Sequence, residues 1–251
     1  MLLPNHPAAA GQLLVAVAAN FTGASREIAQ RFEATSGHRV KISYGSSGKL
    51  FSQIENGAPF EVFLAADSLL PQKAISEGLA IQGSRFSYAL GTLVLWSSQP
   101  TLFADSDTAD TYLRQADFQR IAIANPKTAP YGLAAQQVLI HLGLWETLQD
   151  RIVRADSIAQ TFQFTATGNA KLGFIAQAQI QVWGNKAGSL WLIPESYYRP
   201  IDQQAVLLNK GQHNPVARQF LAFLKGPEAR AIISTHGYSL PSTYQELNHE
   251  L

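Results

Sequence analysis

The chain has 251 residues, of which 46% are hydrophobic and 15% charged, and it carries a formal net charge of +1 and no cysteine. That length can bury the core of one large domain or of two lobes, and the hydrophobic share is too high for a disordered chain. The near-zero charge argues against a nucleic-acid partner, and the lack of cysteine excludes disulfides, thiolate chemistry and cysteine-ligated metals.

Residues 1–10 are expected to be the remnant of a removed signal peptide or residues left over from cloning. They lack the basic region and apolar core of an intact secretory signal, whereas Ala8, Ala9 and Ala10 are typical of a signal cleavage site. No apolar run reaches the ~18 residues that a membrane-spanning helix needs. We therefore expect a periplasmic protein, with a cytoplasmic chain that never carried a signal as the alternative.

Three strand–turn–helix units follow one another in the first part of the chain. The apolar run 13–17 predicts a buried strand, and the helix after it ends at Gly37. Alternating apolar residues over 40–44 predict a second strand, which turns at 45–48 into a short helix. A third strand is predicted over 60–65. Successive units of this kind predict a parallel sheet covered by helices on both faces.

The same pattern returns in the second half of the chain. Strands are predicted over 121–124, 151–155 and 171–176, with an amphipathic helix over 133–142. This repetition predicts a second α/β lobe.

Two β-rich segments, 88–96 and 202–208, are predicted to cross between the lobes. We therefore expect a first lobe made of residues 11–89 and 204–251, and a second lobe made of residues 90–203.

Four predicted strand ends lead into turns rich in small or polar residues. In open α/β sheets, ligands bind beyond these carboxyl ends. Each turn precedes a helix start, whose unpaired backbone N–H groups attract anions without a cationic side chain. One such turn is usually only a helix cap, but four that face a cleft would form a cage of hydrogen-bond donors. The turns are Ala19-Asn20, Ser46-Ser47-Gly48, Ala129-Pro130-Tyr131-Gly132 and Asp156-Ser157-Ile158.

The segments 45–50, 53–60 and 62–67 together resemble the periplasmic molybdate-binding proteins of bacterial ABC transporters. The resemblance extends, with shorter matches, from about Leu13 to Pro241. It implies an α/β, two-lobed periplasmic-binding-protein fold, with mixed sheets flanked by helices and two hinge strands. It also implies a monomer that closes on molybdate or tungstate and delivers it to a membrane permease, without catalysis and without a cofactor.

By position, the resemblance implies ligand contacts from both lobes. The first lobe would supply Ala19, Asn20 and Ser47, and the second would supply Tyr131 and the backbone N–H of Ile158. Relatives often have a hydroxyl residue at the first two positions, so one contact there is expected to come from the backbone alone. Some relatives also use a tyrosine hydroxyl late in the second lobe, a contact not expected here because the corresponding strand ends in alanine at position 176.

Other functions stay open beside this one. An enzyme is disfavoured, because residues 45–49 match neither the hydrolase elbow nor the phosphate-binding P-loop. The six histidines are scattered, which disfavours a zinc site. A ligand-sensing domain of a regulator would carry a DNA-binding segment, and none is recognisable. Binding of another oxyanion, such as sulfate or thiosulfate, or of a small organic acid is the strongest alternative.

Overall fold

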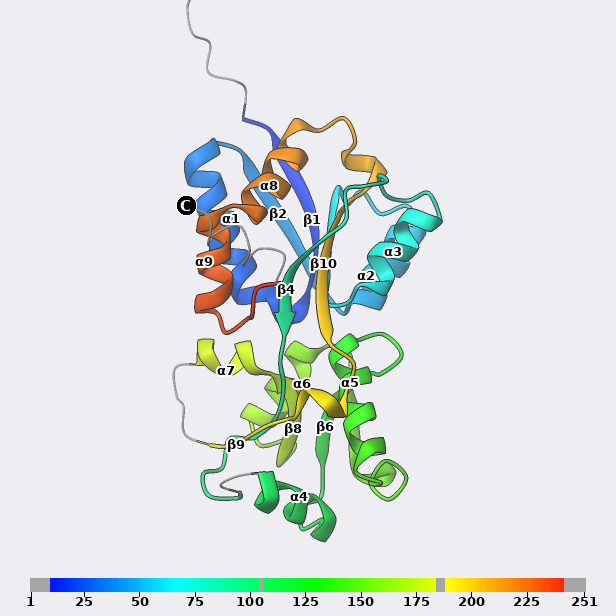
Figure 1. The fold of residues 1–251 in the computed structure, drawn as a ribbon, viewed down its shortest axis with the longest axis vertical. Coiled ribbons are helices and arrows are strands. Elements are labelled where there is room, and N and C mark those ends of the chain that lie inside the picture. Colours follow the sequence, from blue (N-terminus) through cyan, green and yellow to red (C-terminus); the bar gives the residue numbers. More distant parts are fainter. Residues whose placement is uncertain (1–9, 104–105, 184–187, 242–251) are drawn as a thin grey trace, which may run out of the picture.

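The computed structural model describes residues 10–103, 106–183 and 188–241, which form two lobes (Figure 1). Each lobe is built around a five-stranded sheet, with strand orders β2-β1-β3-β10-β4 and β7-β6-β8-β5-β9. Both sheets mix parallel and antiparallel pairs, so the predicted two-lobed α/β fold is confirmed. The predicted signal remnant, apart from Ala10, lies outside the described residues.

The first sheet combines three parallel strands from the start of the chain with two that connect the lobes. The parallel strands are β1 (Gln12–Ala18), β2 (Arg39–Gly45) and β3 (Val62–Ala65). Strand β10 (Ile201–Leu207) lies between β3 and β4 (Phe86–Gly91) and is antiparallel to both.

Helices cover both faces of this sheet. One face packs against α1 (Thr22–Ser36), α8 (Pro215–Lys225) and α9 (Pro227–Thr235), and the other against α2 (Ser47–Glu55) and α3 (Leu69–Ser76). Strand β1 is therefore buried on both sides, which explains why its sequence is an apolar run without alternation.

The second sheet contains β5 (Leu93–Ser97), β6 (Ile121–Ala124), β7 (Ile152–Ala155), β8 (Leu172–Ala176) and β9 (Ser189–Leu192). Strand β6 pairs in parallel with β7 and β8, and β5 pairs antiparallel with β8 and β9. Strand β9 was not predicted.

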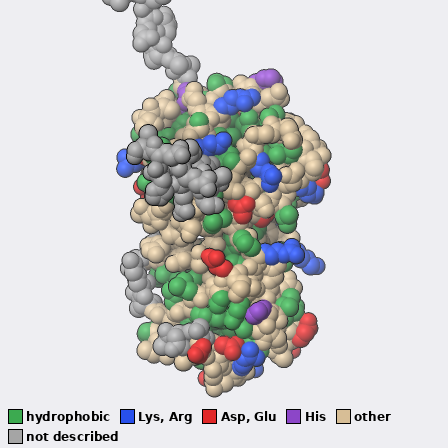
Figure 2. Space-filling view, in the orientation of Figure 1, with side chains coloured by type: hydrophobic (Ala, Val, Ile, Leu, Met, Phe, Trp, Pro, Cys, Tyr) green, Lys and Arg blue, Asp and Glu red, His purple; other side chains and the backbone are tan. Residues whose placement is uncertain are grey.

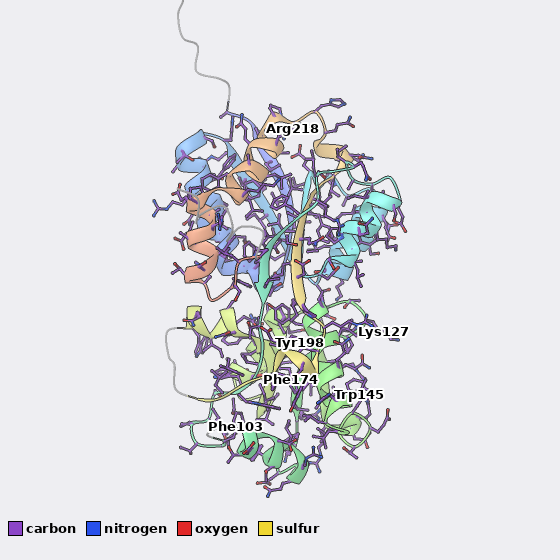
Figure 3. All side chains as sticks on the ribbon, in the orientation of Figure 1. Phe103, Lys127, Trp145, Phe174, Tyr198 and Arg218 are labelled. Carbon is purple, nitrogen blue, oxygen red and sulfur yellow. The ribbon has the colours of Figure 1, made fainter. Side chains whose placement is uncertain are left out.

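The helices of the second lobe are α4 (Ser106–Gln115), α5 (Pro130–His141), α6 (Ile158–Ala166) and α7 (Gln177–Trp183). Their main core gathers around buried aromatic and aliphatic side chains such as Phe174 (Figure 3). Helices α4 and α7 were also not predicted. No helix within the described residues is long and apolar enough to span a bilayer.

The chain passes between the lobes twice (Figure 1). The first passage lies between Gly91 of β4 and Leu93 of β5, and the second lies between β9 and β10. Tyr198 stands on the second passage and braces the first, because its hydroxyl accepts a hydrogen bond from the N–H of Leu93 at 3.2 Å. We propose lobe boundaries at these passages, near residues 92 and 200.

Candidate functional site

A small cavity of about 10 Å³ lies where the two lobes meet. Its lining contains every residue that the sequence nominated: Ala19, Asn20, Ser47, Tyr131 and Ile158. A cavity of this size holds roughly one water molecule, whereas pockets for organic ligands are usually at least ~300 Å³. The site is therefore much smaller than a pocket for an organic acid, and a tetrahedral oxyanion enters it only if the lobes separate slightly.

The wall from the first lobe is made where β1 and β2 end side by side. These strands are parallel and in register, with Ala18 opposite Gly45. The residues that follow, Ala19 and Ser46, consequently leave the same edge of the sheet. Strand β1 continues into a one-turn 3-10 helix (Ala19–Phe21), and β2 continues into α2.

The wall from the second lobe repeats this arrangement. Strands β6 and β7 are parallel, with Ala124 opposite Ala155, and lead to α5 and α6. Tyr131 is the second residue of α5, after a proline that suits the first helical position. Ile158 is the first residue of α6, which Ser157 caps. Four helix starts thus converge on one cavity.

The helix starts supply backbone donors without a cation. First-turn N–H groups have no acceptor within their own helix, and no hydrogen bond between described residues uses those of Ser47, Tyr131 or Ile158. The helix dipoles add positive potential at the same ends. No Lys, Arg or His of the described residues lines the cavity, and Lys127 in the turn before α5 (Figure 3) is not among its lining residues. The arrangement can stabilise an anion with neutral groups alone.

Two serine hydroxyls complete the wall of the first lobe. The Ser47 hydroxyl oxygen accepts the N–H of Ala66 at 2.9 Å, which leaves its own proton free to donate. The Ser46 hydroxyl is buried, with the residue 4% exposed, and has no partner among the described residues. Sequence reasoning chose Ser47 and missed Ser46 as a site residue, although the doubled serine in the turn was a usable signal.

The remaining lining residues are Ala18, Ala66, Ala129 and Pro130. They have no polar side chain, so residue type gave no signal for them. Their place beside the predicted turns was the only indication. Ala176 does not line the cavity, and its N–H donates to the Gln179 side chain at 3.0 Å.

The Asn20 carboxamide is anchored within the first lobe. Its Nδ2 donates to Gln203 Oε1 at 2.6 Å and lies 3.3 Å from the Tyr238 hydroxyl, which itself donates to the Asn20 carbonyl at 2.7 Å. The side chain therefore holds the turn after β1 in place, and the backbone N–H is the group of Asn20 best placed to face a ligand.

The Tyr131 side chain runs from α5 to the hinge. Its hydroxyl lies against Gly91, where a Cβ would collide with it, and has no hydrogen-bond partner among the described residues. Burial raises the pKa of Tyr131 well above its usual value, and the neighbouring Tyr238 and Tyr88 add to the shift. The phenol thus stays protonated at physiological pH. The backbone N–H of Tyr131 lies at the start of α5, like the backbone donors of the other turns, and is the group of this residue that we expect to face a ligand.

One acidic residue follows the cavity lining directly. Asp67 comes after Ala66, and its Oδ1 accepts the N–H of Leu70 at 2.7 Å, in the first turn of α3. Burial raises the pKa of Asp67; hydrogen bonds from the N–H groups of Leu70 and Leu69 oppose the rise, and the charge of Asp202 adds to it. No group of three His, Cys, Asp or Glu side chains within the described residues could hold a metal ion.

Comparisons with known proteins agree with this geometry. The model of the family described as bacterial extracellular solute-binding protein matches residues 13–239. The molybdate-binding protein ModA of Azotobacter vinelandii is 50% identical over 93% of this chain and 92% of its own, and that of Rhodobacter capsulatus is 48% identical over 92% and 90%.

Solved structures give the same result. The periplasmic molybdate-binding protein of Azotobacter vinelandii superposes with a TM-score of 0.86 at 48% identity, covering 91% of this chain and 99% of its own. The sulfate-binding protein SubI of Mycobacterium tuberculosis has a TM-score of 0.72 at 15% identity, covering 96% and 91%, which shows a shared fold alone.

Proposed function

This chain belongs to the bacterial extracellular solute-binding protein family, and on that premise we propose that it binds molybdate between its lobes and presents it to the membrane permease of an ABC transporter. The observation that carries the proposal is the small interlobe cavity, whose walls offer donors from both lobes and no cation. The relatives named for molybdate, about half identical over nine-tenths of the chain, support the identity of the anion.

The proposed donors come from four turns. The first lobe contributes the hydroxyls of Ser46 and Ser47 and backbone N–H groups of Ala19, Asn20 and Ser47, and the second contributes the N–H groups of Tyr131 and Ile158. Each charge-assisted hydrogen bond contributes about 1.5–3 kcal/mol. Five or six of them cover the roughly 8–12 kcal/mol of micromolar to nanomolar binding, even after the cost of closing the lobes.

The same donors favour an unprotonated dianion. Backbone N–H groups cannot accept a hydrogen bond, so the proton of hydrogen phosphate would meet few acceptors in this cavity. Tungstate has the charge and shape of molybdate and is expected to bind as well. Sulfate carries no proton that would need an acceptor, so the donors do not exclude it. Its exclusion must depend on the size of the cavity.

Other parts of the proposal follow from the family. We propose a monomeric periplasmic protein that needs no cofactor and catalyses no reaction. An enzyme is the weaker alternative, because a serine nucleophile requires a nearby base and the described lining contains no His, Asp, Glu or Lys. On the face shown in Figure 2, the charged side chains are scattered and mixed in sign, unlike the basic stripe of a nucleic-acid-binding protein.

A thermal-shift panel of molybdate, tungstate, sulfate and phosphate tests the proposal. A ligand that binds only the folded state raises the melting temperature in proportion to the logarithm of its concentration over Kd. Molybdate and tungstate should give large shifts, and sulfate and phosphate at equal concentration little or none. An equal shift with sulfate would show that the protein binds oxyanions in general and does not select molybdate. No shift with any of the four would refute oxyanion binding.

A further inference from the structure

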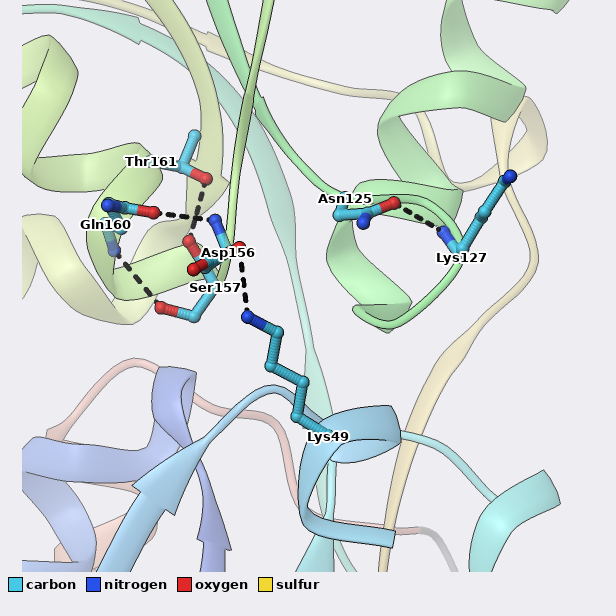
Figure 4. A network of polar contacts seen from close by, with 7 residues as sticks. All are labelled: Lys49, Asn125, Lys127, Asp156, Ser157, Gln160 and Thr161. Atoms are coloured by element: carbon cyan, nitrogen blue, oxygen red, sulfur yellow. Dashed lines mark hydrogen bonds and ion pairs between the residues drawn. The ribbon is translucent and has the colours of Figure 1, made fainter. Parts of the chain in front are cut away.

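Two residues that directly follow the serines of the cavity contact the opposite lobe. The N–H of Gly48 donates to the carbonyl oxygen of Thr128 at 2.8 Å. Lys49 Nζ lies 2.9 Å from Asp156 Oδ1, and Figure 4 shows its side chain reaching from α2 across to the second lobe. The first turn of α2 therefore both lines the cavity and forms the rim where the lobes meet.

Gly48 allows backbone to lie against backbone at this rim. A Cβ at Gly48 would stand 2.9 Å from the Thr128 carbonyl oxygen, closer than real Cβ contacts, and 3.0 Å from the Thr128 Cα, tighter than most of them. Gly48 has an ordinary helical backbone within α2, so its conformation does not require glycine. The backbone that approaches the glycine after the serines is therefore that of the other lobe.

The Thr128 backbone cannot easily move aside. The carbonyl of Asn125 accepts the N–H groups of Thr128 at 3.1 Å and Ala129 at 2.9 Å, and the Asn125 side chain accepts the N–H of Lys127 at 3.1 Å (Figure 4). The turn is thus braced against the start of α5. Any added bulk at Gly48 must be accommodated by moving one lobe away from the other.

We propose that Gly48 sets how far the lobes close, and thereby the width and size selectivity of the oxyanion cage. This inference rests on the proposed function. Gly48 adjoins Ser47 on one wall of the cavity, and Thr128 precedes Tyr131 by three residues on the other wall. The contact between Gly48 and Thr128 therefore fixes the distance between the donors of Ser47 and Tyr131. Because the cavity is only about 10 Å³, a small increase in lobe separation lengthens every hydrogen bond from the second lobe.

The ion pair beside this contact plays a smaller part. The side chains of Lys49 and Asp156 are 47% and 74% exposed, so solvent and salt screen their attraction. The long, flexible Lys49 side chain can follow a change in lobe separation and keep this contact. The limit on closure therefore comes from Gly48 and not from Lys49.

The variant Gly48→Ala tests the proposal, with Ser52→Ala in the same helix as the matched control. Ser52 is exposed, and no hydrogen bond between described residues uses its hydroxyl. Calorimetry should show that Gly48→Ala weakens molybdate binding about tenfold or more, the loss expected from one charge-assisted hydrogen bond. The preference for molybdate over sulfate should shrink, because the cage no longer fits one size. Ser52→Ala should bind both anions as the parent protein does.

Lobe separation is measured in the same variants with paired labels. The chain has no cysteine, so Gln72→Cys in α3 and Ile140→Cys in α5, both exposed, allow specific spin labelling of the two lobes. With molybdate bound, the distance should be longer in Gly48→Ala than in the parent. The ligand-free melting temperature should be equal or higher, because alanine favours the helix over glycine.

Each outcome decides between explanations. A Gly48→Ala protein with unchanged affinity, selectivity and lobe distance would overturn the inference and leave the proposed function intact. A parent protein that binds no oxyanion would instead overturn the proposed function. A lowered ligand-free melting temperature in Gly48→Ala would show that the glycine serves the fold and not closure, which also overturns the inference.

Discussion

Removal of the Ser47 hydroxyl should have two separable effects. In the structure this oxygen accepts the N–H of Ala66, and its proton is free for a ligand. Ser47→Ala therefore leaves the N–H of Ala66, a residue 2% exposed, without its partner, which costs about 1–3 kcal/mol of folding stability. It also removes one charge-assisted hydrogen bond to the anion, about 1.5–3 kcal/mol, or roughly a 10- to 150-fold increase in Kd.

The two effects require two assays. Differential scanning calorimetry of the ligand-free variant should show a melting temperature lower by roughly 2–12 °C, given the usual 2–4 °C per kcal/mol for a protein of this size. Isothermal titration with molybdate, at a temperature where the variant is fully folded, should show the weaker affinity. Ser52→Ala, exposed on the same helix, is the control and should change neither quantity appreciably.

The two outcomes have different meanings. If Ser47→Ala binds molybdate as tightly as the parent while losing stability, the hydroxyl holds Ala66 and does not contact the anion. If neither the melting temperature nor the molybdate affinity changes, the hydrogen bond from Ala66 to the Ser47 hydroxyl is refuted as well.

Further predictions concern the other residues around the cavity. Ser46→Ala should weaken molybdate binding about tenfold in a titration but leave the ligand-free melting temperature unchanged or higher, since this buried hydroxyl has no partner within the described chain; a stability loss without an affinity loss would contradict this. Tyr131→Phe should keep molybdate affinity within about threefold, because the proposed contact is the backbone N–H; a tenfold loss would assign the contact to the hydroxyl. Asp67 has a raised pKa in the folded state, so its contribution to stability is present at low pH and is lost as the pH rises through that pKa. Asp67→Asn should therefore gain stability relative to the parent between acidic and neutral pH in urea titrations, and a constant difference across that range would contradict the burial of this carboxyl.

Much of the fold could be predicted because local patterns agree with the packing. The run 13–17 reads as a buried strand because helices cover both faces of β1. The short strand β9 and helix α7 lack such a signal: the burial of β9 alternates over only four residues, and α7 is a seven-residue helix of mixed composition. Their existence depends on packing against β5 and the hinge, which a single sequence does not display.

The site was predictable where turn chemistry is local. Ala19, Asn20, Ser47, Tyr131 and Ile158 were found as residues at strand ends and helix starts. The role of the Asn20 side chain was not, because its partners Gln203 and Tyr238 lie about two hundred residues away along the chain. For the same reason, the approach of Gly48 to Thr128 could not be read from the sequence, since it depends on how one lobe meets the other.

The most direct test of the central claim is a calorimetric titration of the unmodified protein with molybdate in the presence of excess sulfate. The proposed cage predicts one molybdate per chain, bound with micromolar or tighter Kd, and a titration curve that excess sulfate leaves unchanged. No heat of binding, or competition by sulfate at concentrations similar to those of molybdate, would contradict it.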